Sequence, residues 1–249
     1  MLKLIVLGSG TCVPSLTRNA PGYYMEAEDY QLLVDCGSGT LLQLERAGKS
    51  YRDIDAVFIT HRHPDHFADL MPLIHALLAT PKFKREKDLF IFGPTEFITY
   101  YDKSIATVLG KPKDFTIQSH TIDDRLEFGP FNVFTEKTLH SASSIAYRLE
   151  CGGKTVVFTG DAAYDQGLIE ISIAADLLVA DCSFPDADKV KGHLSAKECG
   201  IVAKKAGVKK MLLSHLYPAD TPDTERVNES REAFDGEVIL AEDLMEIDI

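Results

Sequence analysis

Short runs of apolar, often β-branched residues recur along the chain, and glycine, aspartate or proline bounds each of them. Such runs are typical of buried β-strands that end in turns. The pattern predicts strands over residues 2–7, 32–34, 56–60, 89–92, 155–159, 177–180, 211–214 and 238–240.

Longer segments with apolar residues at helical spacing lie between many of these strands. They predict helices over residues 41–47, 67–79, 95–108, 195–206 and 224–234. Ser195, with Glu198 three residues later, has the form of a capping box at the start of one helix. Residues 115–150 instead predict successive strands joined by turns at Asp123-Asp124 and Gly129-Pro130.

Strand-rich and alternating segments together indicate an α/β fold, a layered sandwich with mixed sheets. The chain has no repeat, no low-complexity tract and no linker, so we expect a single domain over residues 1–249.

The charge balance narrows the class of partner. There are 38 acidic and 26 basic side chains, a formal net charge of −12, and such a surface repels a long phosphate polymer. The five cysteines form no C-x-x-C pair, which favours a reducing compartment. The sequence has neither a signal-peptide pattern nor the roughly 18 apolar residues of a membrane span. We therefore expect a soluble cytoplasmic protein with no membrane contact.

Four residues of metal-ligand type lie in one hexapeptide, directly after the predicted strand that ends at Thr60: His61, His63, Asp65 and His66. A strand end that runs into a loop can direct such side chains at one shared point. Imidazole and carboxylate both suit zinc, manganese and iron. The hexapeptide is thus a candidate metal site.

Three further candidate ligands also follow predicted strands, namely His140, Asp161 and His215. Ligands at strand ends lie along one rim of a sandwich. Five imidazoles and two carboxylates suffice for two divalent cations, zinc or else manganese or iron, and require no thiolate. The sequence therefore predicts a two-metal site.

The motif T-H-x-H-x-D-H from Thr60 to His66, followed in order by His140, Asp161 and His215, resembles the signature of the metallo-β-lactamase superfamily. The resemblance implies a four-layer αβ/βα sandwich of two mixed sheets, with the metals at the edge between them. It assigns the first metal to His61, His63 and His140. It assigns the second to Asp65, His66 and His215, and makes Asp161 a bridge.

A second segment bears on the branch of the superfamily. Residues 192–198 are similar to the G-H-x-[ST] motif of the ribonuclease Z-like branch, in which the histidine gives a proton to the scissile phosphate group. The resemblance makes His193 a candidate general acid, oriented by Asp181 or Asp186. A surface position beside a helix cap is the alternative. An aspartate at position 161 is unlike the β-lactamases with a cysteine ligand, which disfavours penicillin hydrolysis.

One departure from that branch concerns the substrate. Ribonuclease Z proper inserts a long arm that grips transfer RNA between the third histidine and the bridging aspartate, but only twenty residues separate His140 from Asp161. The chain is closer to the short-chain phosphodiesterases of the branch. The missing arm and the net charge disfavour nucleic acid and favour a small or short phosphodiester. The branch also suggests a homodimer.

On this interpretation the chain is a dinuclear metal-dependent hydrolase. A hydroxide held between the cations attacks phosphorus, because metals lower the pKa of bound water from about 16 towards 7. Asp65 would orient or deprotonate this water, and His193 would protonate the leaving oxygen. Asp35, at another strand end, is either a partner that fixes a ligand histidine or a plain turn aspartate.

Other functions compete for the same residues. A thioester or lactone hydrolase, similar to glyoxalase II or the lactonases, keeps the metals but has no need for His193. A transfer-RNA 3′-processing endonuclease requires the missing arm. A non-catalytic metal-binding sensor has no need of all seven ligands.

The remaining features have plainer interpretations. Gly8-Ser9-Gly10 lacks the third glycine of a dinucleotide-binding motif, so it predicts a tight loop near the site. We expect His75 and His120 to be packed or surface residues. The basic run of Lys82, Lys84, Arg85 and Lys87 is a candidate for steering an anionic substrate.

Overall fold

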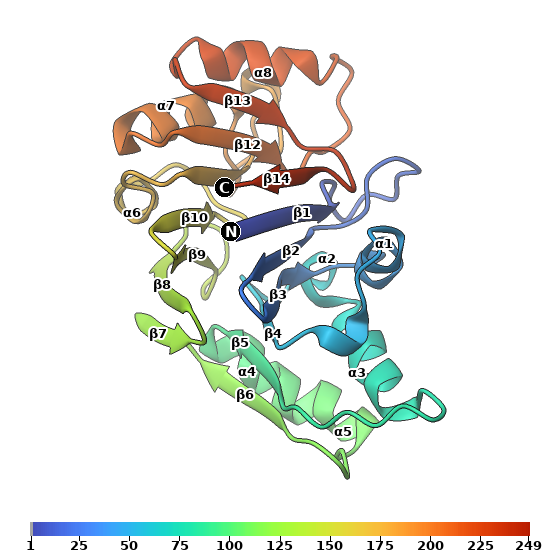
Figure 1. Ribbon diagram of the computed structural model, residues 1–249. Coiled ribbons are helices and arrows are strands. Elements are labelled where there is room, and N and C mark those ends of the chain that lie inside the picture. Colours follow the sequence, from blue (N-terminus) through green and yellow to red (C-terminus); the bar gives the residue numbers. More distant parts are fainter. Residues whose placement is uncertain (1) are drawn as a thin grey trace.

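The structure of the protein, a computed structural model, describes residues 2–249. Two seven-stranded sheets face each other, and helices cover the outer face of each (Figure 1). This arrangement confirms the four-layer αβ/βα sandwich expected from the sequence.

The first sheet is built from both ends of the chain. From one edge to the other it consists of β14 (Glu246–Asp248), β1 (Leu2–Gly8), β2 (Gly22–Ala27), β3 (Tyr30–Cys36), β4 (Ala56–Phe58), β5 (Leu89–Gly93) and β6 (Ile117–Thr121). Strands β14 to β3 pair antiparallel, and β3 to β6 pair parallel. Because β1 pairs with β14, the two ends of the chain lie side by side (Figure 1).

The second sheet repeats this plan. It consists of β7 (Arg125–Phe128), β8 (Phe131–Lys137), β9 (Ile145–Cys151), β10 (Lys154–Phe158), β11 (Leu177–Asp181), β12 (Lys210–Ser214) and β13 (Glu237–Leu240). Strands β7 to β10 pair antiparallel, and β10 to β13 pair parallel. Each sheet therefore has one antiparallel and one parallel half.

Helices form the two outer layers. Those on the first sheet are α1 (Thr40–Arg46), α2 (Pro64–Phe67), α3 (Leu70–Ala79), α4 (Thr95–Tyr100) and α5 (Ala106–Leu109), with a π-helical turn (Tyr101–Ile105) between the last two. Those on the second sheet are α6 (Gln166–Ile171), α7 (Ala196–Ala206) and α8 (Thr224–Arg231).

Successive side chains along a strand point to opposite faces of the sheet, so each strand contributes apolar residues to both faces. In β1, Leu4 and Val6 point into the core between the sheets, whereas Ile5 and Leu7 pack under the helices. Strands buried on both faces read as continuous apolar runs, which is why the sequence identifies them so readily.

Every strand and helix predicted from the sequence is present, with shifted ends, but the pattern missed β2, β14 and α6. The helix predicted over residues 67–79 begins only at Leu70, because Pro64 opens a separate short helix, α2. The capping box is confirmed: the Ser195 hydroxyl accepts from the Glu198 amide, and the Glu198 carboxylate accepts from the Ser195 amide.

The successive strands predicted over residues 115–150 are confirmed as β6 to β9, but they do not form one sheet. Strand β6 is the edge of the first sheet and β7 the edge of the second. The turn at Asp123-Asp124 is therefore the crossing between the two sheets. The turn at Gly129-Pro130 closes a hairpin, β7–β8, as expected.

The glycines near the N-terminus, the cysteines and the length of the helices each bear on an expectation from the sequence. Gly8 is the last residue of β1 and Gly10 lies in the loop after it; both are tightly packed, and a Cβ on Gly8 would lie 1.8 Å from the Ala20 carbonyl oxygen. Cys12 is exposed, and the other four cysteines are buried and free. Among residues 2–249, the structure has no helix long and apolar enough to cross a membrane.

Arg85 does not belong to a basic surface. Its side chain is buried, and its guanidinium donates four hydrogen bonds of 2.7–2.9 Å to the carbonyl oxygens of Arg52, Ile54, Lys87 and Asp88. These bonds join the segments that enter β4 and β5. Arg85 is thus a structural residue, which leaves only the lysines of the basic run to steer a substrate.

We therefore expect Arg85→Met to lower the free energy of unfolding by about 2–3 kcal/mol, because it leaves buried carbonyl oxygens without donors. The matched control is Lys84→Met in the same segment. Its side chain is 64% exposed and makes one exposed ion pair, so it should change stability by less than about 0.5 kcal/mol. Urea denaturation measures both, and equal losses would contradict the structural role of Arg85.

Candidate metal centre

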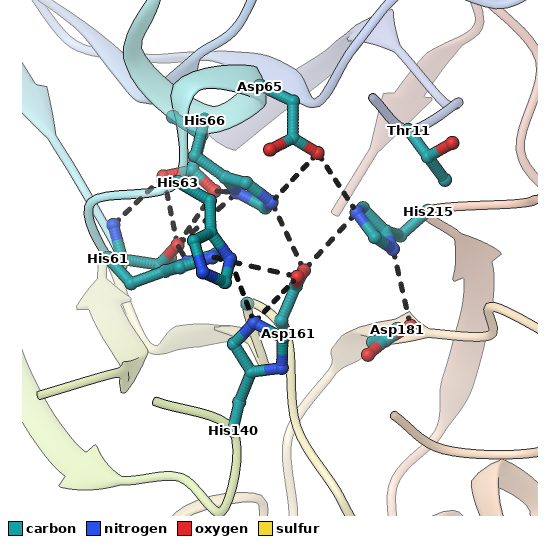
Figure 2. Close-up of polar contacts among 12 residues, drawn as sticks. Thr11, His61, His63, Asp65, His66, His140, Asp161, Asp181 and His215 are labelled. Atoms are coloured by element: carbon teal, nitrogen blue, oxygen red, sulfur yellow. Dashed lines mark hydrogen bonds and ion pairs between the residues drawn. The ribbon is translucent and has the colours of Figure 1, made fainter. Parts of the chain in front are cut away.

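Polar side chains gather where the parallel strands of both sheets end. Asp35 lies near the end of β3, and the hexapeptide follows β4 in the first sheet. In the second sheet, Asp161, Asp181 and His215 lie at or just after the ends of β10, β11 and β12. Carboxyl ends of parallel strands are the usual binding side of α/β sheets. Figure 2 shows the labelled side chains of the hexapeptide and those of Asp161 and His215 pointing toward one another.

The first group of candidate ligands is His61, His63, His140 and Asp161, and one nitrogen or oxygen atom from each lies within 4.8 Å of the others. His63 Nδ1 is 2.9 Å from His61 Nε2 and 3.0 Å from His140 Nε2. Asp161 Oδ2 is 3.3 Å from His140 Nε2. This is the set that the family resemblance assigns to the first metal.

The second group is Asp65, His66 and His215, which also lie within 4.8 Å of one another. Asp161 reaches this group with its other oxygen, since Oδ1 is 3.1 Å from His66 Nε2 and 3.3 Å from His215 Nε2. One carboxylate therefore faces both groups, as expected of a bridging ligand.

Three buried atoms where Asp161 meets the second group form ion pairs of 3.1–3.3 Å but make no hydrogen bond of good geometry among the described residues: His66 Nε2, His215 Nε2 and Asp161 Oδ1. A buried polar atom without a partner costs about 1–3 kcal/mol. A cation among these atoms would satisfy all three at once. The donor set, imidazole and carboxylate without thiolate, fits a divalent cation such as zinc, manganese or iron.

The electrostatics of the site also favour bound positive charge. Burial lowers the pKa of His61 and of His140, which keeps these imidazoles neutral with a lone pair free. For His215 the effect of burial is outweighed by Asp161 and the neighbouring carboxylates Asp181 and Asp65, which raise its pKa to about 10. The same negative potential attracts a metal cation.

Further groups fix the orientation of the ligand histidines. Asp35 Oδ2 lies 2.7 Å from His66 Nδ1 and also accepts from the Thr60 hydroxyl. Asp35 is thus the hydrogen-bond partner of a candidate ligand histidine rather than a plain turn aspartate. The Gly192 carbonyl accepts from His140 Nδ1 at 3.0 Å. Both contacts leave the Nε2 atom of the histidine for the centre of the site.

His193 lies beside both ligand groups. Its ring centroid is 4.8 Å from that of His140 and 5.5 Å from that of His215. Its Nδ1 donates to Asp181 Oδ2 at 2.8 Å, so Asp181 orients it; Asp186 instead accepts from the Ser195 hydroxyl. Burial lowers the pKa of His193, but the bond to Asp181 outweighs it, and the pKa is raised.

Ser183 connects this pair to the candidate metal centre, and no sequence pattern indicated it. Its hydroxyl donates to Asp181 Oδ1 at 2.6 Å, and its oxygen lies 3.0 Å from His215 Nδ1. Because the hydroxyl proton is used on Asp181, the oxygen accepts from His215 Nδ1, which leaves His215 Nε2 free as a ligand. A serine has no spacing signal that could have revealed this role.

His75 and His120 do not take part. Both are exposed, and His120 stacks on Phe92 with ring centroids 5.8 Å apart. Neither belongs to a group of candidate ligands.

Two facing mixed sheets with a His/Asp cluster at the carboxyl ends of their parallel strands define a hydrolase of the metallo-β-lactamase fold. A family model described as "Beta-lactamase superfamily domain" matches residues 30–216. The chain belongs to this superfamily.

Individual relatives narrow the class. The "Probable metallo-hydrolase YhfI" of Bacillus subtilis is 35% identical over 243 residues, which cover 96% of this chain and 97% of that protein. The crystal structure of YhfI superposes with a TM-score of 0.86 over 100% of both chains at 32% identity. The "Ribonuclease Z" of Archaeoglobus fulgidus is 26% identical, with 100% of this chain and 98% of that protein covered. The short form of human tRNase Z shares the fold, with a TM-score of 0.79, 23% identity and 99% of both chains covered.

The chain is therefore a metallo-hydrolase with ribonuclease Z-like relatives, as the motifs indicated. Its alignment with the archaeal enzyme spans 306 positions, more than its own 249 residues, so that enzyme has segments that this chain lacks. Most of the interval from His140 to Asp161 is the hairpin β9–β10, closed by Gly152-Gly153. A turn of two residues leaves no room for an arm there.

Metal binding itself is the first test of this centre. We expect the purified protein, equilibrated with zinc or manganese and passed through a desalting column, to retain about two ions per chain. Asp161→Ala should lower this number, because the substitution removes the one carboxylate that faces both groups. Elemental analysis measures the ions retained.

The matched control is Asp176→Ala, which removes a carboxylate of the second sheet that is also buried but pairs with Lys209. Its metal content should equal that of the unmodified protein. Full metal content in Asp161→Ala would contradict the assignment.

Proposed function

We propose that this metallo-hydrolase is a dinuclear phosphodiesterase that acts on a small or short phosphodiester. The observation that supports it best is the pair His193–Asp181, placed beside both groups of candidate ligands. Cleavage of a phosphodiester expels an alkoxide, which needs a proton as it leaves. A thioester expels a thiolate that can leave as an anion, so a thioesterase has less use for an oriented acid.

The seven candidate ligands would hold two divalent cations, which when bound lower the pKa of water towards 7 and neutralise charge on phosphoryl oxygens. Asp65 is the ligand best placed for a second role. Its Oδ2 lies 3.7 Å from Nε2 of both His66 and His215, and its side chain is 11% exposed. Its carboxylate can accept a hydrogen bond or a proton from the attacking water.

His193 would act on the opposite side of the phosphorus atom. Its Nδ1 is held by Asp181, and its Nε2 has no hydrogen-bond partner among residues 2–249. The Nε2–H can therefore donate its proton to the departing oxygen, a contribution of about 100- to 10,000-fold in rate. Asp181 acts through His193 and is a positioning residue.

The shape of the site supports a diester. Two cavities flank the hexapeptide, one of about 400 Å³ that reaches Asp65 and one of about 470 Å³ that reaches His63. Pro64 lines both. Figure 2 shows Thr11, from the first cavity, beside Asp65 and His215. A diester has two ester arms, and each cavity can take one of them.

A substrate of modest size fits the same observations. The net charge of −12 opposes a long polyanion, and the short hairpin β9–β10 takes the place of an RNA-gripping arm. The names of the ribonuclease Z relatives suggest processing of transfer RNA instead. The experiments below therefore include precursor transfer RNA as a substrate.

The role of His193 can be tested by comparing two diesters whose leaving groups differ in their need for a proton. His193→Ala should lower kcat by at least about 100-fold for a dinucleoside monophosphate, whose alkoxide must be protonated. The kcat for bis(p-nitrophenyl) phosphate should fall much less, because p-nitrophenolate leaves without a proton. A chelator should abolish both reactions. Steady-state kinetics on metal-loaded protein measure all of these.

The matched control is His75→Ala, which removes an exposed histidine of α3. Equal losses on the two diesters would contradict a general acid at His193. Metal-loaded protein that is inert to every phosphodiester but active on a thioester or lactone would contradict the proposed function, and rapid cleavage of precursor transfer RNA would contradict the small substrate.

A further inference from the structure

The cavity that reaches His63 combines an aromatic wall with an arginine at its rim. Its 470 Å³ lie within the range of small-molecule sites. It is bounded by the hexapeptide, by α4 and by the loop after β8. Because His63 is also a member of the first ligand group, a phosphodiester at the centre would have one ester arm next to this cavity.

One wall of the cavity is aromatic. Phe67 is anchored from behind, its ring centroid 5.4 Å from that of the fully buried Phe97. The Tyr100 ring packs on Phe67 at 5.6 Å with an angle of 62° between the planes. Tyr100 nevertheless remains 38% exposed. A ring that is fixed in place yet open to solvent is a surface on which a planar ligand can stack.

Arg62 supplies hydrogen-bond donors at the rim. Its Nε pairs with Glu96, and the other oxygen of Glu96 accepts from the Ser143 hydroxyl at 2.6 Å. Both oxygens of Glu96 are thus engaged. The two terminal nitrogens of Arg62 have no partner among residues 2–249. A guanidinium edge of this kind matches the ring carbonyls and ring nitrogens of a nucleobase.

We propose that this cavity binds the nucleoside portion of the substrate, with the base stacked on Tyr100 and its acceptor edge on Arg62. This inference rests on the proposed phosphodiesterase function and narrows its substrates to nucleotidyl esters. A plain alkyl arm would leave both the Tyr100 face and the Arg62 donors unused. The second arm, which leaves, would enter the other cavity on the side of His193, away from the water that Asp65 orients: Cys12 of that cavity contacts Tyr217, whose ring centroid lies 5.9 Å from that of His193.

A pair of substrates with the same leaving group tests this subsite. Thymidine 5′-(p-nitrophenyl phosphate) and methyl p-nitrophenyl phosphate differ only in the arm that is retained. We expect a higher kcat/KM for the nucleoside ester, and Tyr100→Ala should lower the ratio of the two values about tenfold, a typical loss for one stacking aromatic. Tyr100→Phe keeps the ring and should restore the ratio.

The matched control is Val108→Ala on α5, which truncates another exposed apolar side chain, 71% exposed and outside the cavity. Its ratio should equal that of the unmodified protein. An unchanged ratio in Tyr100→Ala would overturn the subsite.

A binding experiment does not depend on turnover. The sequence contains no tryptophan, so Tyr100→Trp places a single indole in the cavity wall. Adenosine 5′-monophosphate should quench its fluorescence saturably, whereas ribose 5-phosphate, which lacks the base, should not. Val108→Trp is the control and should respond to neither ligand.

The outcomes separate the two proposals. If the metal-loaded protein hydrolyses neither ester, the proposed function is wrong, and the fluorescence titration alone decides on the cavity. Equal quenching by the two ligands, or none by the nucleotide, would overturn the nucleoside subsite while leaving a phosphodiesterase in place.

Discussion

The structure depends on one buried carboxylate. Asp161 is 3% exposed, and imidazole nitrogens of His66, His215, His140 and His61 surround it at 3.1–3.6 Å. His61 and His66 come from the first sheet, whereas His140 and His215 belong to the second. A buried charge is costly unless it is paired. The contacts to Asp161 therefore join the two halves of the sandwich at the candidate metal centre.

Local backbone conformation prepares this junction. Asp35 and His215 both adopt a positive φ of 55°, which costs a non-glycine residue about 1–3 kcal/mol. Both lie near the ends of parallel strands, β3 and β12, and their side chains turn into the gap between the sheets. Gly160, also at positive φ, brings the end of β10 against Thr60, since a Cβ there would lie 2.8 Å from that of Thr60. The fold thus accepts strain at two strand ends, and places a glycine at the third, to bring the candidate ligands within reach of one another.

The sequence predicts the parts of the fold that depend on burial alone. The central strands, such as β1 and β11, are apolar on both faces, so their runs are unmistakable. Strand β14 was missed because its edge position allows the polar sequence Glu-Ile-Asp, and α6 because it is only six residues long. The crossing between sheets at residues 122–124 was missed because a turn has the same sequence signal whether it closes a hairpin or leads to another sheet.

The residues of the candidate site also divide into those that the sequence predicts and those that it misses. His61 to His66, His140, Asp161 and His215 could be found because metal ligands are restricted to a few residue types at strand ends, although their role as ligands stays a prediction. The sequence left Asp181 and Asp186 open, since the choice depends on which carboxylate faces His193. Ser183 and Tyr100 had no signal at all, because serine and tyrosine occur throughout the chain and only tertiary packing places these two at the site. Arg85 was wrongly grouped with the basic residues that could steer a substrate. A run of basic residues does not reveal which of its members is buried.

The candidate ligands and the wall of the cavity beside His63 are held by different elements, so the two can differ independently. In the register of β11 and β12, Asp181 pairs with Ser214, so the support of His193 lies one residue from the ligand His215. Adjacent parallel strands cannot shift relative to each other without breaking this register, which fixes Asp181, the partner of His193, relative to His215. Glu96 and Tyr100 instead follow β5, one strand farther out than the hexapeptide, in a helix that lines the same cavity as His63. On the proposed nucleoside subsite, substitutions there would change what the cavity accepts, while the central strands would keep the candidate ligands and His193 in place.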